Sequence, residues 1–441
     1  MRVLETRVVL TWVRARLPLV ALLAAYGALR VVVLVGARAH GAPDSPGYGA
    51  VSFLGHAPRL WGVPLFYAIF PDEAWRVVGQ WLVGTLAWAG LAAVLWSIAR
   101  HTAAKVAGAT AVVLLALVQY VGALDFMILS ESLSVSLGVV VLAGMLSWSA
   151  RGRPVALVVA VVAAFWWTFT RPDIRVFTLL LVAVLAGVAV RAPARRRAAL
   201  LGAGTLLAAV GWCSVILPST SAVEMTGITS SDEKILQFRL LIEVMPDPDV
   251  RRVFVERFGM PRCAGAERAA VEHPWDIYTF ADAYRECPDL VAWTRSNGTG
   301  VYHRLALVEP ETYLRLNEHF TALALAGGAD ATVPAVLPGF VTRLVFPRQA
   351  WVVAFTLGLL VAAVLAAVLT RARRGALLSG AVLTAGLSLV SLGALVATAG
   401  GATYWRLGIQ ESIGLRLAMV LFVVAAIDAW RDQRRAYPAP V

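Results

Sequence analysis

The sequence predicts an all-α polytopic membrane protein with about ten transmembrane helices and a mostly helical extracytoplasmic domain. Hydrophobic residues make up 59% of the 441 positions and charged residues only 15%, which is too little charge for the surface of a soluble protein of this length. Apolar runs near the roughly 20 residues needed to cross a bilayer recur along the chain. One long polar segment, at about residues 218–348, interrupts them.

Ten apolar runs are candidate membrane spans. The first follows the basic stretch "MRVLETRVVLTWVRAR", which has no small-residue cleavage pattern and therefore favours a retained signal anchor. The fifth and sixth are short and separated only by "TRPD", so they can be a tilted pair or a re-entrant hairpin. The runs cover approximately residues 17–37, 76–98, 104–123, 132–149, 155–170, 174–190, 200–217, 349–370, 376–399 and 413–430.

Basic residues predict the orientation of these runs. Cytoplasmic loops retain Lys and Arg, so the Arg-rich connections are expected in the cytoplasm, together with both termini. The protein is then expected in the cytoplasmic (inner) membrane, and its formal net charge of +12 is a topology signal. Nucleic acid is not an expected partner. The Arg-rich connections are residues 1–16, 99–105, 149–154, 191–199, 371–375 and 430–441.

The chain divides into three predicted parts. Residues 1–217 form an N-terminal membrane core whose first outer loop is 38–75, residues 218–348 form the extracytoplasmic domain, and residues 349–441 form the C-terminal membrane helices. Within the outer segment, "DEKILQFRLLIEV" and "ETYLRLNEHFTALAL" place apolar residues at helical spacing.

The cysteines also bear on topology. Cys263 and Cys287 share the polar segment, whereas Cys213 lies in an apolar run, so at most one disulfide is expected. A bond between Cys263 and Cys287 would place their segment in an oxidising compartment.

Acidic residues outside the polar segment gather at outward-facing ends and turns. This distribution predicts a polar site at the outer membrane surface, while Glu5, Asp428 and Asp432 lie on the cytoplasmic side. The outward-facing acids are Asp44, Asp72, Glu73, Asp125, Glu131, Asp173 and Glu411.

Asp44, in "GAPDSPGY", is the first candidate site residue. Pro43 and Pro46 restrict their neighbours and Gly47 permits unusual dihedral angles, so the carboxylate is expected in a turn near the end of the first span. The following "FLGHAPRLWGVPLFYAIF" is aromatic and weakly charged, which is typical of a segment in the membrane interface. The alternative is that Asp44 only caps an interfacial helix.

The second candidate is "LDFMILSESLSVSL", in which Asp125 and Glu131 flank a short apolar turn. The structural alternative is that Ser130 is an N-cap and Glu131 a first-turn acid that favours the helix dipole.

The third candidate is "WWTFTRPDIR", which carries Arg171 and Arg175. A guanidinium near the outer interface suits a phosphate ester. A snorkelling arginine beside an aromatic belt is the alternative.

The fourth candidate, "TYWRLGIQESIGLRLAMVL", contains Arg406, Glu411 and Arg416. Arg416 lies within an apolar pattern, where a charge needs a partner. That partner is either Glu411, in an ion pair, or a lipid phosphate. Arg30, inside the first span, raises the same question.

Metal and nucleotide motifs are not apparent. The six histidines show no metal-ligand spacing, and no glycine-rich phosphate loop or nucleophile elbow appears in a suitable context.

The arrangement resembles the GT-C superfamily, the multi-span glycosyltransferases that use polyprenyl-phosphate-linked sugars. "DSPGY" with "RLWGVPLFY" is similar to the first-loop motif of that superfamily, and "SESL" is similar to a recurring second element. The resemblance covers the membrane core to about residue 190 and the last helix. Two departures are that Ser45 stands where relatives carry a second acid, and that "WW" does not continue into the WWDYG signature. Protein glycosylation is therefore not the expected activity.

The resemblance implies a function. Asp44 would be the general base in sugar transfer from a polyprenyl-phosphate donor to a glycan or lipid acceptor outside the membrane, as in cell-wall polysaccharide biosynthesis. An alternative role of Asp44 and Glu131 is to bind a divalent cation, and no nucleotide cofactor is expected. A lipid or glycan transporter and a polysaccharide polymerase or ligase are the alternatives. The implied substrate-binding residues are Tyr48, Asp125, Glu131, Arg171, Arg406, Glu411 and Arg416.

Overall fold

The computed structural model is helical throughout the part of the chain that it describes. Its only β-type pairing among these residues is an isolated bridge between His40 and Met127. The described ranges are residues 2–41, 45–70, 72–221, 231–274, 276–326, 333–347, 351–372, 375–398 and 408–436.

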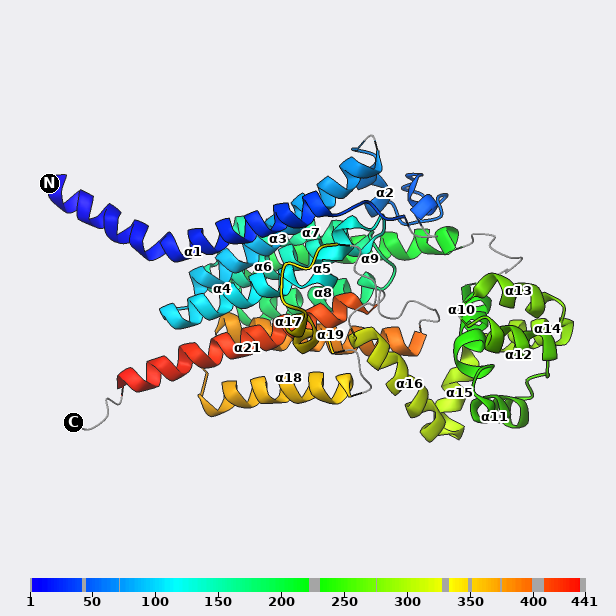
Figure 1. Ribbon diagram of the computed structural model, residues 1–441. Coiled ribbons are helices and arrows are strands. Elements are labelled where there is room, and N and C mark those ends of the chain that lie inside the picture. The colour runs from blue at the N-terminus through cyan, green and yellow to red at the C-terminus, as the bar shows by residue number, and fades with distance from the viewer. Residues whose placement is uncertain are drawn as a thin grey trace.

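A bundle of long, roughly aligned helices forms the membrane part of the protein (Figure 1). Within the described ranges, eight helices are long and apolar enough to cross a bilayer, which identifies a multi-pass membrane protein. They are α1 (Arg2–Gly36, whose apolar part is Arg16–Gly36), α3 (Glu73–Ile98), α6 (Glu131–Arg151), α8 (Ile174–Arg191), α9 (Arg196–Ser221), α18 (Val352–Leu369), α19 (Ala376–Thr398) and α21 (Ile409–Ala436).

Two of the ten predicted spans have a different form. The run at 155–170 is α7 (Pro154–Thr168), which has only 15 residues. The run at 104–123 breaks into α4 (Thr102–Leu117) and α5 (Gln119–Ala123), and the chain bends there by 55°. The expectation of one continuous helix at 104–123 is therefore wrong.

Tertiary contacts explain this break. Beyond Val118, Gln119 Nε2 donates to the carbonyl of Val333 at 2.7 Å, and the Tyr120 ring packs edge-on against Phe346 at 5.2 Å between centroids. Both partners lie more than 200 residues further along the chain, so apolar periodicity could not reveal them.

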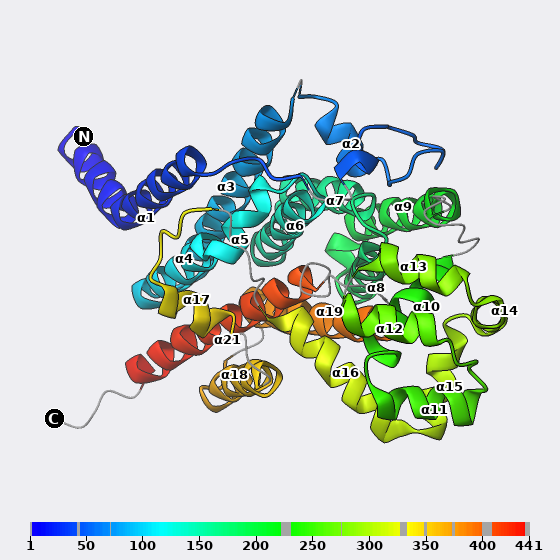
Figure 2. The same ribbon diagram turned by 45° about the vertical axis from the view of Figure 1, so that its right-hand side comes forward.

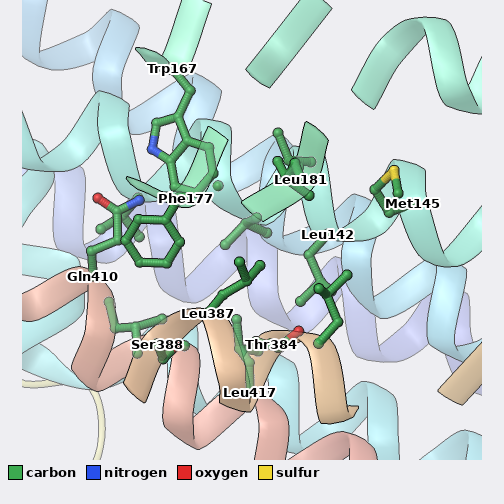
Figure 3. A pocket seen from close by; sticks show the side chains of 17 residues that line it. Leu142, Met145, Trp167, Phe177, Leu181, Thr384, Leu387, Ser388, Gln410 and Leu417 are labelled. Atoms are coloured by element: carbon green, nitrogen blue, oxygen red, sulfur yellow. The ribbon is translucent and has the colours of Figure 1, made fainter. Parts of the chain in front are cut away.

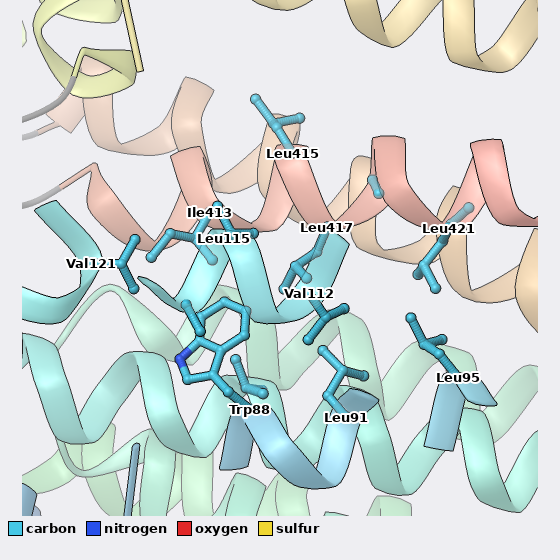
Figure 4. Packing of buried hydrophobic residues seen from close by; sticks show 14 of the residues in the cluster. Trp88, Leu91, Leu95, Val112, Leu115, Val121, Ile413, Leu415, Leu417 and Leu421 are labelled. Atoms are coloured by element: carbon cyan, nitrogen blue, oxygen red, sulfur yellow. The ribbon is translucent and has the colours of Figure 1, made fainter. Parts of the chain in front are cut away.

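The bundle core forms around α21, which packs against α4, α18 and α19. Figure 4 shows Trp88, Leu91 and Leu95 of α3 meeting leucines and valines of α4 and α21 in this core. α1 begins and α21 ends at the same end of the bundle (Figure 1). The loops that carry the candidate site residues lie at the opposite end.

Short helices beyond that opposite end form a separate domain (Figures 1 and 2), which we call the outer domain after its predicted side of the membrane. Its hydrophobic core includes Phe254, Phe280 and Trp293. The predicted helix in "DEKILQFRLLIEV" is α10 (Ser231–Arg239) followed by a π-helical turn at Leu240–Val244. The remaining helices of this core are α11 (Pro248–Phe258), α12 (Ala264–Glu272), α13 (Ile277–Arg285), α14 (Pro288–Asn297) and α15 (Gly300–Val308).

Two further helices lead back to the bundle. The predicted helix in "ETYLRLNEHFTALAL" is α16 (Pro310–Leu325), and α17 (Gly339–Val345) follows it. Phe320 and Leu325 of α16, with Phe346 after α17, join the hydrophobic core of the bundle. Arg239 makes a further link, because its Nη2 donates to the carbonyl of Val396 in α19 at 2.7 Å.

The expected disulfide joins Cys263 and Cys287, whose Cα atoms lie 6.1 Å apart. Each cysteine immediately precedes a helix of the outer domain, α12 or α14. Cys213 is buried and is not disulfide-bonded.

Replacing Cys263 with Ser is expected to destabilise the outer domain by about 2–4 kcal/mol, the range typical of losing a native disulfide. Thermal unfolding of purified protein measures the effect, and Cys213→Ser controls for loss of a thiol. Equal electrophoretic mobility of the alkylated wild type with and without reductant would show that the bond does not form.

Candidate functional site

A buried polar cluster lies where four segments meet, at the end of the bundle that is predicted to face outward. Glu131 is the first residue of α6, Arg171 and Asp173 lie between α7 and α8, and Glu411 is in the first turn of α21. Ser391 of α19 completes the cluster. Residues separated by up to 280 positions are thereby brought to one place, which we call the outer cluster.

In the outer cluster, the guanidinium of Arg171 interacts with three carboxylates. Arg171 Nε lies 3.1 Å from Asp173 Oδ1, and Arg171 Nη1 lies 3.8 Å from Glu131 Oε1. Glu411 interacts electrostatically with both Arg171 and Asp173. Ser391 Oγ donates a hydrogen bond of 2.6 Å to Glu411 Oε1.

Burial makes these charges interdependent. Arg171 and Glu131 are each 3% exposed and Glu411 is fully buried. Burial opposes the charge on Arg171, but Asp173, Glu131 and Glu411 together hold the pKa of its guanidinium above the ordinary value. Arg171 therefore stays positively charged, and the three acids are arranged around it.

Ser130 occupies the N-cap position of α6, as the helix-cap interpretation expected, but its side chain makes no capping hydrogen bond. Its Oγ instead lies 3.4 Å from Glu131 Oε2. Glu131 does occupy the first turn of α6, as that interpretation expected.

A hydrogen-bond network lies directly below the outer cluster. Ser134 Oγ donates to Gln410 Oε1 at 2.8 Å and accepts from Trp167 Nε1 at 3.0 Å. Sequence reasoning missed Gln410, although it directly precedes Glu411 and follows an outer loop.

Below this network, an apolar cavity of about 70 Å³ extends between α6, α8, α19 and α21 (Figure 3). Gln410 and Trp167 lie at one end of it in Figure 3. The cavity therefore extends from a polar end along apolar side chains of these helices. Other residues that line it include Leu142, Met145, Phe177, Leu181, Leu387 and Leu417.

Hydrogen bonds attach the first outer loop to the chain segment that precedes Glu131. The His40 N–H donates to the carbonyl of Phe126 at 2.8 Å, and the Ile128 N–H donates to the carbonyl of His40 at 3.1 Å. Ser45 Oγ donates to the carbonyl of Ile128 at 2.8 Å. Asp44 itself lies outside the described residues, but both flanks of its short segment are bonded to the chain that leads into Glu131.

The aromatic part of this loop contains a short helix, α2 (Gly62–Tyr67). The Gly62 N–H donates to the carbonyl of Phe169 at 3.0 Å, and Trp166 Nε1 donates to the carbonyl of Gly62 at 2.8 Å. Trp61 stacks on Phe169 with 4.5 Å between ring centroids. These contacts dock the first outer loop on the segment that carries Arg171.

Replacing Gly62 with Ala is expected to destabilise the protein by about 1–3 kcal/mol, because overpacking a close contact forces the backbone to move. An added Cβ would lie 2.6 Å from the carbonyl oxygen of Phe169. Gly90→Ala is the control, since a Cβ at Gly90 meets no atom within 4 Å. Thermal unfolding in detergent compares the two, and equal midpoints would contradict the close docking of α2.

Tyr48 is the buried last residue of the short helical turn that follows Asp44. Its ring meets Tyr67 edge-on at 6.0 Å, and the Arg59 guanidinium lies 5.4 Å from the Tyr48 ring centroid. Sequence reasoning did not select Arg59. The available signal was a lone cation in the otherwise uncharged stretch "FLGHAPRLWG".

Asp125, predicted to bind substrate, belongs to a separate network inside the bundle. It forms an ion pair with Arg30, and Ser132 Oγ donates to its Oδ1 at 2.5 Å. Arg30 Nε also donates to Thr85 Oγ1 at 3.1 Å. Arg30 and Asp125 are 2% and 6% exposed and are each other's ion-pair partner, so no ligand is needed to explain their burial.

The contacts of Arg416 also indicate a structural role. Its guanidinium donates to the carbonyls of Val345 at 2.6 Å and Leu325 at 3.2 Å, and it lies 4.0 Å from the Phe346 ring centroid. Neither expected partner, Glu411 or a lipid phosphate, is needed to explain its burial. Arg416 fastens the ends of α16 and α17 to α21. Arg406 lies outside the described residues.

Within the described ranges, no three His, Cys, Asp or Glu side chains are grouped so that they could hold a metal ion. The divalent cation therefore stays a prediction that concerns Asp44, which lies outside those ranges.

Comparisons with protein-family models, with curated proteins and with solved structures found no match to this chain.

Proposed function

We propose that this protein is a GT-C-type glycosyltransferase that moves a sugar from a polyprenyl-phosphate donor to a glycan or lipid acceptor at the outer membrane surface. The observation that carries the proposal is the outer cluster, in which Glu131, Arg171 and Glu411 are buried together beside the fastened flanks of Asp44. Buried charge gathered at one end of a membrane bundle is costly and is typical of a functional site.

The proposed topology has ten crossings, counting α7 and the bent α4–α5 pair as one each. Both termini are then cytoplasmic, and the outer cluster and the disulfide-bonded domain face outward. Two features support this topology, namely the basic residues at the opposite end of the bundle and the Cys263–Cys287 bond, which needs an oxidising compartment.

In the proposed reaction, Asp44 takes the proton of the acceptor hydroxyl as general base. The acceptor oxygen attacks the anomeric carbon, the bond from that carbon to the phosphate oxygen breaks, and the configuration inverts. The polyprenyl phosphate leaves with the bonding electron pair.

The surrounding residues have distinct proposed roles. Arg171 is a positioning residue that holds Glu131 toward the first outer loop, where Glu131 orients the acceptor. Arg59, over Tyr48, and Arg406 stabilise the negative charge that develops on the departing phosphate. The apolar cavity below Gln410 accommodates part of the isoprenoid chain of the donor.

The proposal is tested by incubating purified protein in detergent with labelled sugars on two classes of donor. We expect a polyprenyl-phosphate sugar to donate its label and the corresponding nucleotide sugar to be inert. Use of the nucleotide sugar alone would contradict the proposed donor class. Movement of labelled lipid between leaflets without transfer would favour a transporter.

A further inference from the structure

A groove separate from the outer cluster lies between α16, α18 and α19. Its volume is about 340 Å³, and hydrocarbon side chains dominate its lining. By comparison, an apolar cavity of about 150 Å³ is large enough to bind benzene. The lining residues are Tyr313, Leu314, Asn317, Thr321 and Leu325 of α16, Val353 and Leu357 of α18, and Leu389, Leu392, Gly393 and Val396 of α19.

The helices around this groove leave it accessible from the bilayer. α18 packs chiefly against α21 and α16, and α16 returns from the outer domain toward the bundle (Figure 2). Leu357 and Leu389 remain 40% and 39% exposed. Because α18 and α19 are both long and apolar enough to span the membrane, the medium next to these side chains is lipid.

The outer rim of the groove is polar but uncharged. Tyr313, Asn317 and Thr321 follow one face of α16 at intervals of four residues. Asn317 Nδ2 and Thr321 Oγ1 donate to carbonyls of α16 itself, at 2.9 and 2.6 Å, so their oxygens are placed to accept hydrogen bonds. Acceptors suit the hydroxyls of a ligand, whereas a phosphate is favoured by guanidinium groups. The rim therefore suits a neutral, hydroxyl-rich headgroup, and the leucines and valines suit its hydrocarbon chain.

The groove shares one wall, α19, with the outer cluster, and a second wall, α16, contacts α21. On α19, Leu389 and Leu392 lie on either side of Ser391 in the sequence, and Ser391 donates a hydrogen bond to Glu411. On α16, the carbonyl of Leu325 accepts a hydrogen bond of 3.1 Å from Ser412 Oγ, next to Glu411 in α21. A chain in the groove would thus lie against α19, which carries Ser391, and against α16, which is hydrogen-bonded to α21 beside Glu411.

We infer that this groove binds the hydrocarbon chain of the acceptor, and that the acceptor is therefore a lipid-anchored, hydroxyl-bearing molecule. The inference rests on the proposed function and narrows it, because it selects a lipid acceptor over a soluble glycan. The donor chain occupies the separate cavity on the α6 and α8 side of α19, so the two lipids approach the outer cluster from opposite sides of that helix.

Gly393→Leu tests the inference by filling the groove. A Cβ at Gly393 meets no atom within 4 Å, so the added side chain enters the groove without a clash of its first atom. Gly386→Leu is the matched control, because it lies two turns earlier on the same face of α19, has the same open surroundings and does not line the groove.

The first readout is photolabelling of the full-length protein in vesicles by an octadecyl glucoside with a diazirine in its chain. We expect labelled peptides from α16, α18 and α19 in the wild type and in Gly386→Leu, with at least about a tenfold loss in Gly393→Leu, since several methylene contacts are displaced. No label on these helices, or equal label in both variants, would overturn the inference. Equal labelling by a diazirine phosphatidylcholine would mean that the groove holds bulk lipid only, which also overturns it.

The second readout separates this inference from the proposed function. Transfer to the octadecyl glucoside is compared with transfer to methyl glucoside, which has the same headgroup and no chain. We expect the chain to lower KM at least about tenfold, and Gly393→Leu to remove that advantage. Equal use of the two acceptors would overturn the inference while the proposed function stands. Photolabelling of the groove without transfer from any donor would overturn both the acceptor role and the proposed function, and would leave a lipid site of another kind.

Discussion

Asp44→Asn is expected to reduce the rate of sugar transfer at least about a hundredfold, which is the effect typical of removing a general base. Asparagine keeps the size and the turn preference of aspartate but cannot accept the acceptor's proton. Initial rates of label transfer at saturating donor measure the effect. The comparison needs matched samples whose thermal unfolding midpoints agree.

The control for this substitution is Asp72→Asn, which removes an acid from the same outer loop. Asp72 is the N-cap of α3 and accepts a hydrogen bond of 2.9 Å from the Trp75 N–H. Asparagine caps helices about as well as aspartate, so this variant should retain activity. If Asp44→Asn turns over like the wild type, the carboxylate is structural and the proposed base is wrong.

Arg171→Met is expected to destabilise the protein by about 3–5 kcal/mol, because it leaves buried carboxylates without their cation. Methionine retains much of the arginine stem's volume, so lost packing contributes little. Reversible unfolding in mixed micelles gives the free-energy difference. Neutralising Glu131 as well, in Arg171→Met/Glu131→Gln, should recover part of the loss, since the two side chains interact directly.

Arg175→Met is the matched control for Arg171, one helical turn further along the chain. Its side chain is only partly buried and donates to the carbonyl of Pro172 at 3.0 Å, so the cost should stay below about 1 kcal/mol. Similar losses for the two arginines would contradict the description of Arg171 as the cation of the outer cluster.

Local sequence patterns predicted much of the membrane part. Apolar length depends only on local composition, and each of the ten predicted runs corresponds to a helix or to the bent α4–α5 pair. The disulfide was predictable because two cysteines shared one polar segment. The break at Val118 was not predictable, since its causes, Val333 and Phe346, are distant in sequence.

The same limit applies to the candidate site. The side of the membrane was inferred for each acid from its place between apolar runs, and this inference grouped Glu131 correctly with Arg171 and Glu411. It could not show that Asp125 pairs with Arg30, 95 positions away in another helix, because no local pattern connects the two residues. The environment of Arg416 was not predictable for a related reason, since its partners are backbone carbonyls, which no side-chain pattern reveals.

The central claim is that a sugar leaves a polyprenyl phosphate at the outer cluster. It is tested most directly by counting both products of one reaction in sealed vesicles whose outer-domain side faces the medium. With labelled polyprenyl-phosphate sugar in the membrane and acceptor in or on the outer leaflet, we predict one released polyprenyl phosphate for each sugar transferred. Folded protein that releases no polyprenyl phosphate from any donor in the panel, or that transfers sugar only when the outer-domain side is enclosed, would contradict the account.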